Sequence, residues 1–229
     1  MSPVWIMIFT ALGGVLAGFA LAGALLYRHL GHLDAARRQI ATEQRRAANA
    51  ERLARRDDTT GLPNRRAFLE HLEQALAADT PVGVVMLDLD DFKTVNDTFS
   101  HETGNDLLTA VGMRLADLRT PVQLAARLSG DEFALLVTGD AEQTRACARA
   151  AWRAITSTPI PIGDRTDWRI KASVGYTTDG ATPRDLLRHA DAAMYQAKQA
   201  GGGVCDRTAA TDAWPKPPGH GRCRDAHRR

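Results

Sequence analysis

The order of strand-like and helix-like segments between residues 82 and 176 constrains this chain most. Short apolar runs typical of buried strands alternate with segments whose apolar residues recur as on one face of a helix. The order strand, helix, strand, strand, helix, strand predicts an α+β, ferredoxin-like fold whose central antiparallel sheet is flanked by helices. The expected elements are residues 82–87, 104–118, 122–128, 133–137, 141–157 and 168–176, with additional helices at 64–78 and 183–200.

Acidic residues are expected to converge at one end of this sheet. In the predicted topology the first and third strands are neighbours that run in opposite directions. Asp88, after the first strand, is therefore expected beside the turn that contains Asp131 and Glu132. Three carboxylates placed together repel one another unless a cation compensates their charge, and oxygen ligands of this kind suit Mg²⁺. The alternative is that Asp131 and Glu132 are ordinary polar turn residues.

Composition supports a globular domain and disfavours a nucleic-acid-binding groove. The chain is 44% hydrophobic and 24% charged, which leaves enough apolar material for a packed core. Its formal net charge of +2 combines basic segments at 28–56 and beyond 203 with an acidic centre at 57–202. An acidic centre disfavours binding to a phosphate backbone, which needs clustered Lys and Arg. The three cysteines follow no metal-ligand spacing, and this favours a reducing compartment.

Residues 1–27 contain no charged side chain, and the run from 4 to 27 is long enough to cross a bilayer as a helix. A cleaved signal peptide is the alternative, but no positive residue precedes the run. The arginines that follow predict a single-pass anchor with the main domain on the cytoplasmic side of the membrane. The small residues Gly14, Gly18 and Ala22 either let two such helices pack closely or reflect the abundance of glycine in membrane helices.

Two further segments flank the main domain. Residues 28–56 are rich in helix formers and have a thin apolar seam, which predicts a helical stalk or a weak parallel coiled coil. The tail at 203–229 contains several Pro and Gly residues and is predicted to be disordered. The predicted organisation is therefore an anchor at 1–27, a stalk at 28–56, one domain at 57–202 and the tail.

Several motifs of the main domain resemble the GGDEF family of diguanylate cyclases, in the family's order and spacing. The signature turn reads SGDEF at 129–133 and is preceded by Arg127. The other similar segments are DTTGLPNRR at 58–66, DLDDFKTVND at 88–97, SVG at 173–175 and ADAAMYQAK at 190–198.

The resemblance implies an enzyme that condenses two GTP molecules into cyclic di-GMP and pyrophosphate, with two Mg²⁺ or Mn²⁺ ions in each site. It implies that one domain holds one GTP, so that activity requires a homodimer formed through the cyclase domain, with the stalk and membrane helix as further contacts. Asp131 and Glu132 would serve catalysis, with Glu132 as a metal ligand or as the group that activates the attacking 3′-hydroxyl. The implied metal ligands are Asp88, Leu89 through its backbone, Asp131 and Glu132, and the implied substrate contacts are Phe92, Lys93, Asn96, Asn105 and Lys198.

Four departures from the family pattern leave a second class of function open. Ser129 replaces the first glycine of the signature, and Gly202 stands where a phosphate-binding Arg is expected. Asn105 stands where an Asp is expected to accept hydrogen bonds from guanine. Thr120 and Gln123 replace the Arg-x-x-Asp of the family's inhibitory site, so product inhibition there is not expected. The alternatives are a degenerate module that binds GTP or a partner protein and signals by dimerising, and a structural membrane scaffold in which the carboxylates are accidental.

Overall fold

The structure is a computed structural model. In it the chain forms two compact units, Met1–Ala54 and Arg55–Arg229. Within the first unit, residues 37–46, 49–51 and 53 are helical. Most of the predicted membrane span at 4–27 and the tail beyond residue 206 lie outside the described residues. Among those that are described, no helix combines the length and the apolar character needed to cross a bilayer. The described residues are 18–19, 23, 28–29, 37–46, 49–51, 53–78, 80–161 and 169–206.

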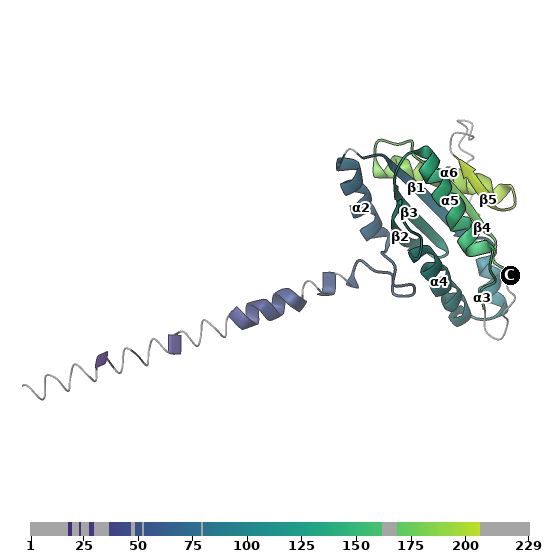
Figure 1. The fold of residues 1–229 in the computed structure, drawn as a ribbon. Coiled ribbons are helices and arrows are strands. Elements are labelled where there is room, and N and C mark those ends of the chain that lie inside the picture. Colours follow the sequence, from purple (N-terminus) through teal and green to yellow (C-terminus); the bar gives the residue numbers. More distant parts are fainter. Residues whose placement is uncertain are drawn as a thin grey trace, which may run out of the picture. The chain divides into compact units, whose positions relative to one another are not determined.

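A five-stranded sheet in the order β2-β3-β1-β4-β5 forms the centre of the second unit (Figure 1). Strand β1 lies between β3 and β4 and is antiparallel to both, whereas β5 pairs with β4 in parallel. This confirms the predicted α+β architecture with an antiparallel centre. The strands are β1 (Val82–Leu89), β2 (Val122–Ser129), β3 (Glu132–Thr138), β4 (Ala172–Thr177) and β5 (Gly203–Asp206).

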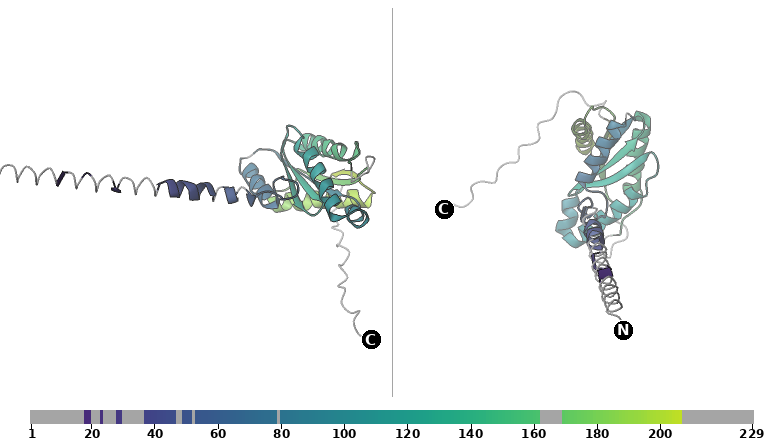
Figure 2. Two further views of the ribbon diagram at one scale, coloured as in Figure 1. Left: turned by 90° about the horizontal axis from the view of Figure 1, so that it is seen from below. Right: turned by 90° about the vertical axis from the view of Figure 1, so that its left-hand side faces the viewer.

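Helices cover both faces of the sheet (Figure 2). One core contains Phe68 of α2 and Leu186 of α6, packed against Val84 of β1. The other core contains Leu107 of α4 and Ile155 of α5, together with side chains of the opposite sheet face. The helices are α2 (Arg65–Ala77), α3 (Phe92–Thr98), α4 (His101–Ala116), α5 (Ala141–Thr156) and α6 (Pro183–Gln199).

The structure contains two elements that the sequence does not predict. The loop after β1 contains the seven-residue helix α3, which is too short to show a helical repeat of apolar residues. Residues 203–206, placed in the disordered tail by composition, form β5. This strand follows glycines at positive φ and is held by its register with β4, so its own sequence carries little strand signal.

Glycine at position 175 lets α6 pack directly on the sheet. A Cβ at this position would lie 2.0 Å from the backbone nitrogen of Met194 and 2.2 Å from the carbonyl oxygen of Ala190. The contacting face of α6 is correspondingly made of small residues, with Ala190, Ala193 and Ala197 fully buried. This close approach brings the last turn of α6, and with it Lys198, to the end of β1.

Candidate active site at the end of strand β1

Strand register places two of the predicted metal ligands directly opposite each other. Asp88 of β1 pairs with Glu132 at the start of β3 and, on its other side, with Ser173 of β4. Opposite residues of antiparallel strands project to the same face of the sheet. That face is the one covered by α2 and α6, because Met86, two positions before Asp88, packs in their core. The predicted meeting of residue 88 with the signature turn is therefore confirmed.

Asp131 adds a further negative charge beside Asp88. It lies in the turn between β2 and β3, and its backbone carbonyl accepts a hydrogen bond from the N–H of Leu89 at 3.3 Å. Burial raises the pKa of Asp88 above its ordinary value, and the charges of Asp131 and Asp90 act in the same direction. A carboxylate in this environment is stabilised by a nearby cation.

The cation that contacts Asp88 in this arrangement is the ammonium of Lys198. It donates a hydrogen bond to Oδ1 of Asp88 at 2.5 Å. The side chain of Asp88 is 11% exposed and that of Lys198 47% exposed, so water reaches the pair mainly around the lysine. Burial lowers the pKa of Lys198, but the hydrogen bond and charge of Asp88, together with the charges of Asp131 and Asp90, outweigh burial and raise this pKa overall. Lys198 is therefore charged at neutral pH.

Asp90 belongs to the same cluster, although the sequence interpretation assigned it no role. Its Oδ1 accepts a hydrogen bond from the hydroxyl of Ser173 at 2.8 Å. Its Oδ2 is buried and has no hydrogen-bond partner among the described residues. A Cβ at Gly202 would lie 3.2 Å from this oxygen. The signal that could have identified Asp90 is its spacing, because it follows Asp88 by two positions and alternate residues of an extended strand share a face.

The chemistry of this cluster fits a hard divalent cation. Carboxylate oxygens are the ligands that Mg²⁺ prefers. The buried Oδ2 of Asp90 is such an oxygen, and it has no hydrogen-bond partner in the described part of the chain. In this arrangement Asp88 accepts a hydrogen bond from Lys198, and Glu132 accepts one from the Ser129 hydroxyl at 2.7 Å. Among the described residues, no group of three or more His, Cys, Asp or Glu is arranged to hold a metal. The metal-ligand roles therefore stay predictions.

Helix α3 carries the predicted phosphate contacts. It follows Asp91, whose φ of 60° is left-handed and whose side chain makes no capping hydrogen bond. The side chain of Asp91 thus leaves the first-turn N–H groups of Phe92 and Lys93 uncapped, which suits binding to phosphate oxygens. The side chain of Lys93 is 85% exposed and its ammonium contacts Asp97 at 2.5 Å. Exposed ion pairs of this kind are weak, so Lys93 is able to exchange Asp97 for a phosphate.

The two amides predicted to read guanine lie where α3 packs on α4. A Cβ at Gly104 would lie 2.0 Å from Oδ1 of Asn96, so the side chain of Asn96 sits directly against a glycine of α4. Asn105 is the next residue along α4 and is exposed. Its backbone carbonyl accepts a hydrogen bond from the hydroxyl of Thr109 at 2.9 Å. The structure thus brings both residues to one helix junction, and their contacts with guanine stay predictions.

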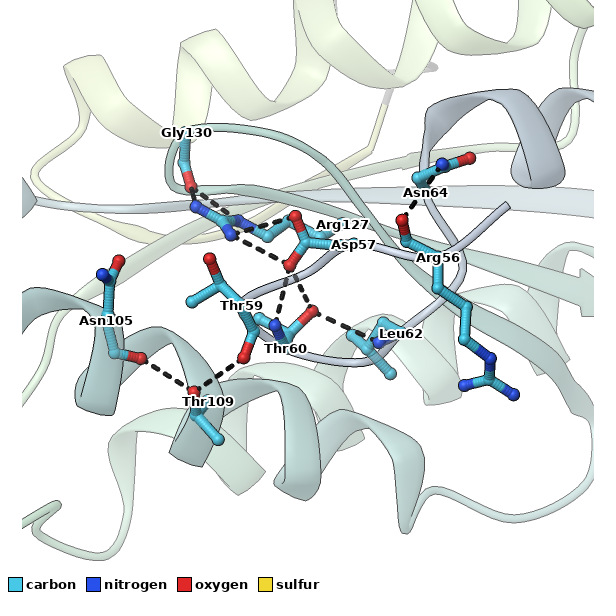
Figure 3. Close-up of polar contacts among 10 residues, drawn as sticks. All are labelled: Arg56, Asp57, Thr59, Thr60, Leu62, Asn64, Asn105, Thr109, Arg127 and Gly130. Carbon is cyan, nitrogen blue, oxygen red and sulfur yellow. Dashed lines mark hydrogen bonds and ion pairs between the residues drawn. The ribbon is translucent and has the colours of Figure 1, made fainter. Parts of the chain in front are cut away.

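A polar network that the sequence interpretation missed ties the signature turn to the segment before α2 (Figure 3). The guanidinium of Arg127 donates to the carbonyl of Gly130 at 2.9 and 2.7 Å and to both carboxylate oxygens of Asp57 at 2.9 and 3.1 Å. Asp57 also accepts hydrogen bonds from the N–H and hydroxyl of Thr60. Burial alone would raise the pKa of Asp57, but the donors of Thr60 and Arg127 outweigh burial and lower it.

The same segment contacts α4. The hydroxyl of Thr109 donates to the backbone carbonyl of Thr59 at 3.1 Å, beside its bond to Asn105 (Figure 3). Residues 57–60 therefore touch both the turn that carries Asp131 and the helix that carries Asn105. A displacement of this segment would reach both parts of the site through direct hydrogen bonds.

Comparison with known proteins agrees with this geometry. The family model described as "Diguanylate cyclase, GGDEF domain" matches residues 54–203. The chain is 38% identical over 197 residues to the bifunctional diguanylate cyclase/cyclic di-GMP phosphodiesterase MucR of Pseudomonas aeruginosa, which covers 81% of this chain and 28% of MucR. It is 39% identical over 170 residues to the cyclic di-GMP phosphodiesterase PdeR of Escherichia coli, which covers 71% of this chain and 25% of PdeR.

A solved structure shows the same fold. The GGDEF domain of DgcB from Caulobacter crescentus, in complex with c-di-GMP, superposes with a TM-score of 0.61 at 27% identity, over 67% of this chain and 93% of that domain. The chain spans about a quarter of the length of the curated relatives MucR and PdeR. The family match covers well over half of the 229 residues, and the chain therefore belongs to the GGDEF family.

Proposed function

We propose that this protein is a diguanylate cyclase that condenses two GTP molecules into cyclic di-GMP and pyrophosphate. The observation that carries the proposal is the convergence, at one end of the sheet, of Asp88, Asp131, Glu132 and Lys198. These residues come from three distant segments of the chain, and together they provide oxygen ligands for a divalent cation and an ammonium for phosphate.

The side chains divide the work of binding and chemistry. Asp88, Asp131 and Glu132, with the backbone of Leu89, would hold two Mg²⁺ or Mn²⁺ ions. When bound, such ions neutralise the charge of the triphosphate and lower the pKa of a coordinated hydroxyl. Lys198, charged and half-exposed, neutralises phosphate oxygens from the side of α6.

Binding of the rest of the nucleotide falls to α3 and α4. The N–H groups of Phe92 and Lys93, with the exposed ammonium of Lys93, would hold terminal phosphate oxygens. Asn96 and Asn105 would bind the guanine edge at the helix junction. Because Asn105 offers an amide in place of a carboxylate, its hydrogen bonds to the two guanine donors would be weaker than charge-assisted ones.

Condensation of two GTP molecules requires two of these domains to face each other, since each domain binds one nucleotide. Holding both reactants in place removes much of the entropic barrier of a reaction between two molecules. We propose a homodimer formed through the cyclase domain, supported by the stalk at 28–56 and by a single membrane helix within residues 4–27. The same segments would place the domain on the cytoplasmic side of a bacterial inner membrane and raise the local concentration of paired domains.

A second candidate function is a non-catalytic module that binds GTP or a partner protein and signals by dimerising. One contact favours it: the ammonium of Lys198 lies at the Asp88 carboxylate, which a divalent cation would otherwise bind. The amide at Asn105 and the glycine at Gly202 would also weaken substrate binding relative to the family pattern.

One assay separates the two candidates. The full chain in detergent is incubated with GTP and Mg²⁺, and cyclic di-GMP is measured by liquid chromatography with mass spectrometry for the parent and for Asp131→Asn. Product from the parent, lost in the variant, supports the cyclase. GTP binding without product from the parent supports the non-catalytic module. Equal product from both proteins removes Asp131 from the mechanism.

A further inference from the structure

A groove on the α2–α6 face of the domain is not explained by the proposed cyclase reaction. Its volume is about 660 Å³, within the range of roughly 300–1,000 Å³ typical of small-molecule sites. The side chains of Met86 from β1 and Leu128 from β2 form an apolar floor. Glu132 also lines the groove, so the groove adjoins the signature turn from the side opposite α3 and α4.

One regular face of each helix forms the walls. Arg65, Leu69 and Glu73 of α2 follow one another at intervals of four, and residues spaced in this way share a helix face. The face of α6 that lines the groove carries two basic side chains, one apolar side chain and one acidic side chain. In chain order these residues are Arg184, Leu187, Arg188 and Asp191. Each wall therefore combines basic, apolar and acidic side chains.

Two of the arginines are available to bind an anion. Arg65 and Arg184 are exposed, and within the described part of the chain neither makes an ion pair at salt-bridge distance. Arg188 differs, because it contacts Asp185 at 3.0 Å. Guanidinium groups bind phosphate through paired N–H donors, so these two positions suit a phosphate-bearing ligand.

Asp191 gives the groove a hydrogen-bond acceptor of a different kind. It is partly buried in the wall of the groove. Burial raises the pKa of Asp191, and the charge of Glu132 raises it further. A carboxylate in such surroundings gains from N–H donors supplied by a ligand.

We propose that this groove is a second nucleotide site that binds guanine nucleotides, with the base on the apolar floor, its edge against Asp191 and its phosphate at Arg65 and Arg184. The guanine edge presents two adjacent donors, N1–H and the 2-amino group, to a carboxylate that only accepts. Adenine would turn its N1 acceptor toward the same carboxylate. Asp191 and Arg184 are seven residues apart, about 10 Å along the helix axis, a separation that an extended nucleotide spans between its base and its phosphates.

Apart from Glu132, the residues that line the groove have no part in the proposed GTP site, and binding of a nucleotide to the groove needs no divalent metal. Equilibrium dialysis measures the affinity of the full chain in detergent for labelled GMP, GTP, cyclic di-GMP and ATP. EDTA is present throughout and prevents turnover by removing divalent cations. An Asn96→Ala background removes one of the two guanine contacts proposed for the first site, and EDTA removes the divalent cations that would hold the triphosphate there. We expect guanine nucleotides to bind in this background, and ATP to bind at least tenfold more weakly. The affinities for GMP and for cyclic di-GMP show whether the groove prefers the mononucleotide or the cyclic dinucleotide.

Variants assign the binding to the groove. Asp191→Asn, which preserves shape but loses the second acceptor, should weaken binding of guanine nucleotides at least tenfold, as expected for loss of a charge-assisted pair. Arg65→Ala should weaken binding of guanine nucleotides several-fold. Because Arg65 is exposed, this variant is expected to remain folded, so it still tests the groove if Asp191→Asn unfolds. Arg66→Ala, next to Arg65 but outside the groove lining, is the matched control and should bind as the parent does.

Three results would overturn the proposal: no guanine nucleotide bound in EDTA, equal affinity in the parent and in both groove variants, or ATP bound as tightly as GTP. Each of these is separable from the proposed enzymatic function. A chain that makes cyclic di-GMP with Mg²⁺ but binds no nucleotide in the Asn96→Ala background keeps the cyclase assignment and loses the second site.

Discussion

The ammonium of Lys198 lies 2.5 Å from the carboxylate of Asp88, although 110 positions separate the two residues in the chain. The contact exists because α6 packs against the sheet at Gly175, where the backbone of the helix leaves no room for a Cβ. A buried acid is thereby neutralised by a half-exposed base at the point where the nucleotide is proposed to bind. Without a ligand, Lys198 therefore stabilises the folded protein by neutralising Asp88. When a nucleotide is bound, the same ammonium is placed to contact its phosphates.

Replacing Lys198 by Met is expected to destabilise the metal-free protein at neutral pH. The variant leaves Asp88 buried without its partner, and after allowance for solvent screening of the exposed lysine we expect a loss of about 1 kcal/mol. Burial already raises the pKa of Asp88, so ionised Asp88 costs stability as the pH rises above the usual Asp value. The difference between parent and variant should therefore vanish in acid, where Asp88 is protonated in both. Urea unfolding at several pH values measures it, and Lys198→Arg, which keeps the charge, should recover most of the loss.

How much of this fold was predictable depended on the type of signal. The run of apolar residues that ends at Asp88 and the split order of strands predict that Asp88 lies next to Glu132, because strand order alone decides which strands are neighbours. The ion pair with Lys198 needed the packing distance of α6, which depends on the absence of a side chain at Gly175. No periodic pattern in the sequence expresses that distance.

Local signals failed where an element is short or a side chain acts across the fold. Helix α3 is seven residues long, and β5 follows glycines that are usually read as loop. In the sequence Arg127 stands out only as the residue before the signature, yet its guanidinium binds Asp57, which is 70 positions away. Long polar side chains reach partners that neither propensity nor alternation predicts.

Arg127→Ala is expected to destabilise the domain and to loosen the signature turn. The side chains of Arg127 and Asp57 are 11% and 22% exposed, and loss of one partner of such a pair, together with two bonds to the Gly130 carbonyl, should cost about 2–3 kcal/mol. Because the pKa of Asp57 is lowered in the folded protein, its contribution is present above the usual Asp pKa and is lost as the pH falls through the lowered value. The deficit of the variant should therefore shrink in acid.

Urea unfolding between neutral and acidic pH checks this expectation. The matched control is Arg66→Ala, whose partner Glu70 is contacted from an exposed position and which should unfold as the parent does. A variant of Arg127 as stable as the parent at neutral pH would show that the network in Figure 3 contributes nothing to stability.

Asn105→Asp is expected to strengthen use of GTP. A carboxylate at this exposed position of α4 would accept both donors of the guanine edge, and a charge-assisted hydrogen bond contributes roughly 1.5–3 kcal/mol. We therefore expect kcat/KM for GTP to rise by about tenfold or more, with a smaller gain for inosine triphosphate, which lacks the 2-amino donor. Steady-state formation of cyclic di-GMP measures both. Asp106→Asn, one residue further along the helix, is the control and should leave the ratio of kcat/KM for GTP to that for inosine triphosphate unchanged. If Asn105→Asp raised kcat/KM equally for the two nucleotides, residue 105 would not contact the base.

A pair of glycine variants separates packing from substrate binding. Gly175→Ala puts a Cβ 2.0 Å from the backbone nitrogen of Met194, and because neither backbone can yield easily, we expect a loss of about 3 kcal/mol or more. Gly104→Ala puts a Cβ equally close to Oδ1 of Asn96, but this atom belongs to a side chain that is able to rotate away. The second variant should therefore remain folded while its affinity for GTP falls, because Asn96 is displaced from the helix junction. Thermal unfolding and GTP titration of both proteins test this contrast, and normal GTP affinity in folded Gly104→Ala would remove Asn96 from the guanine site.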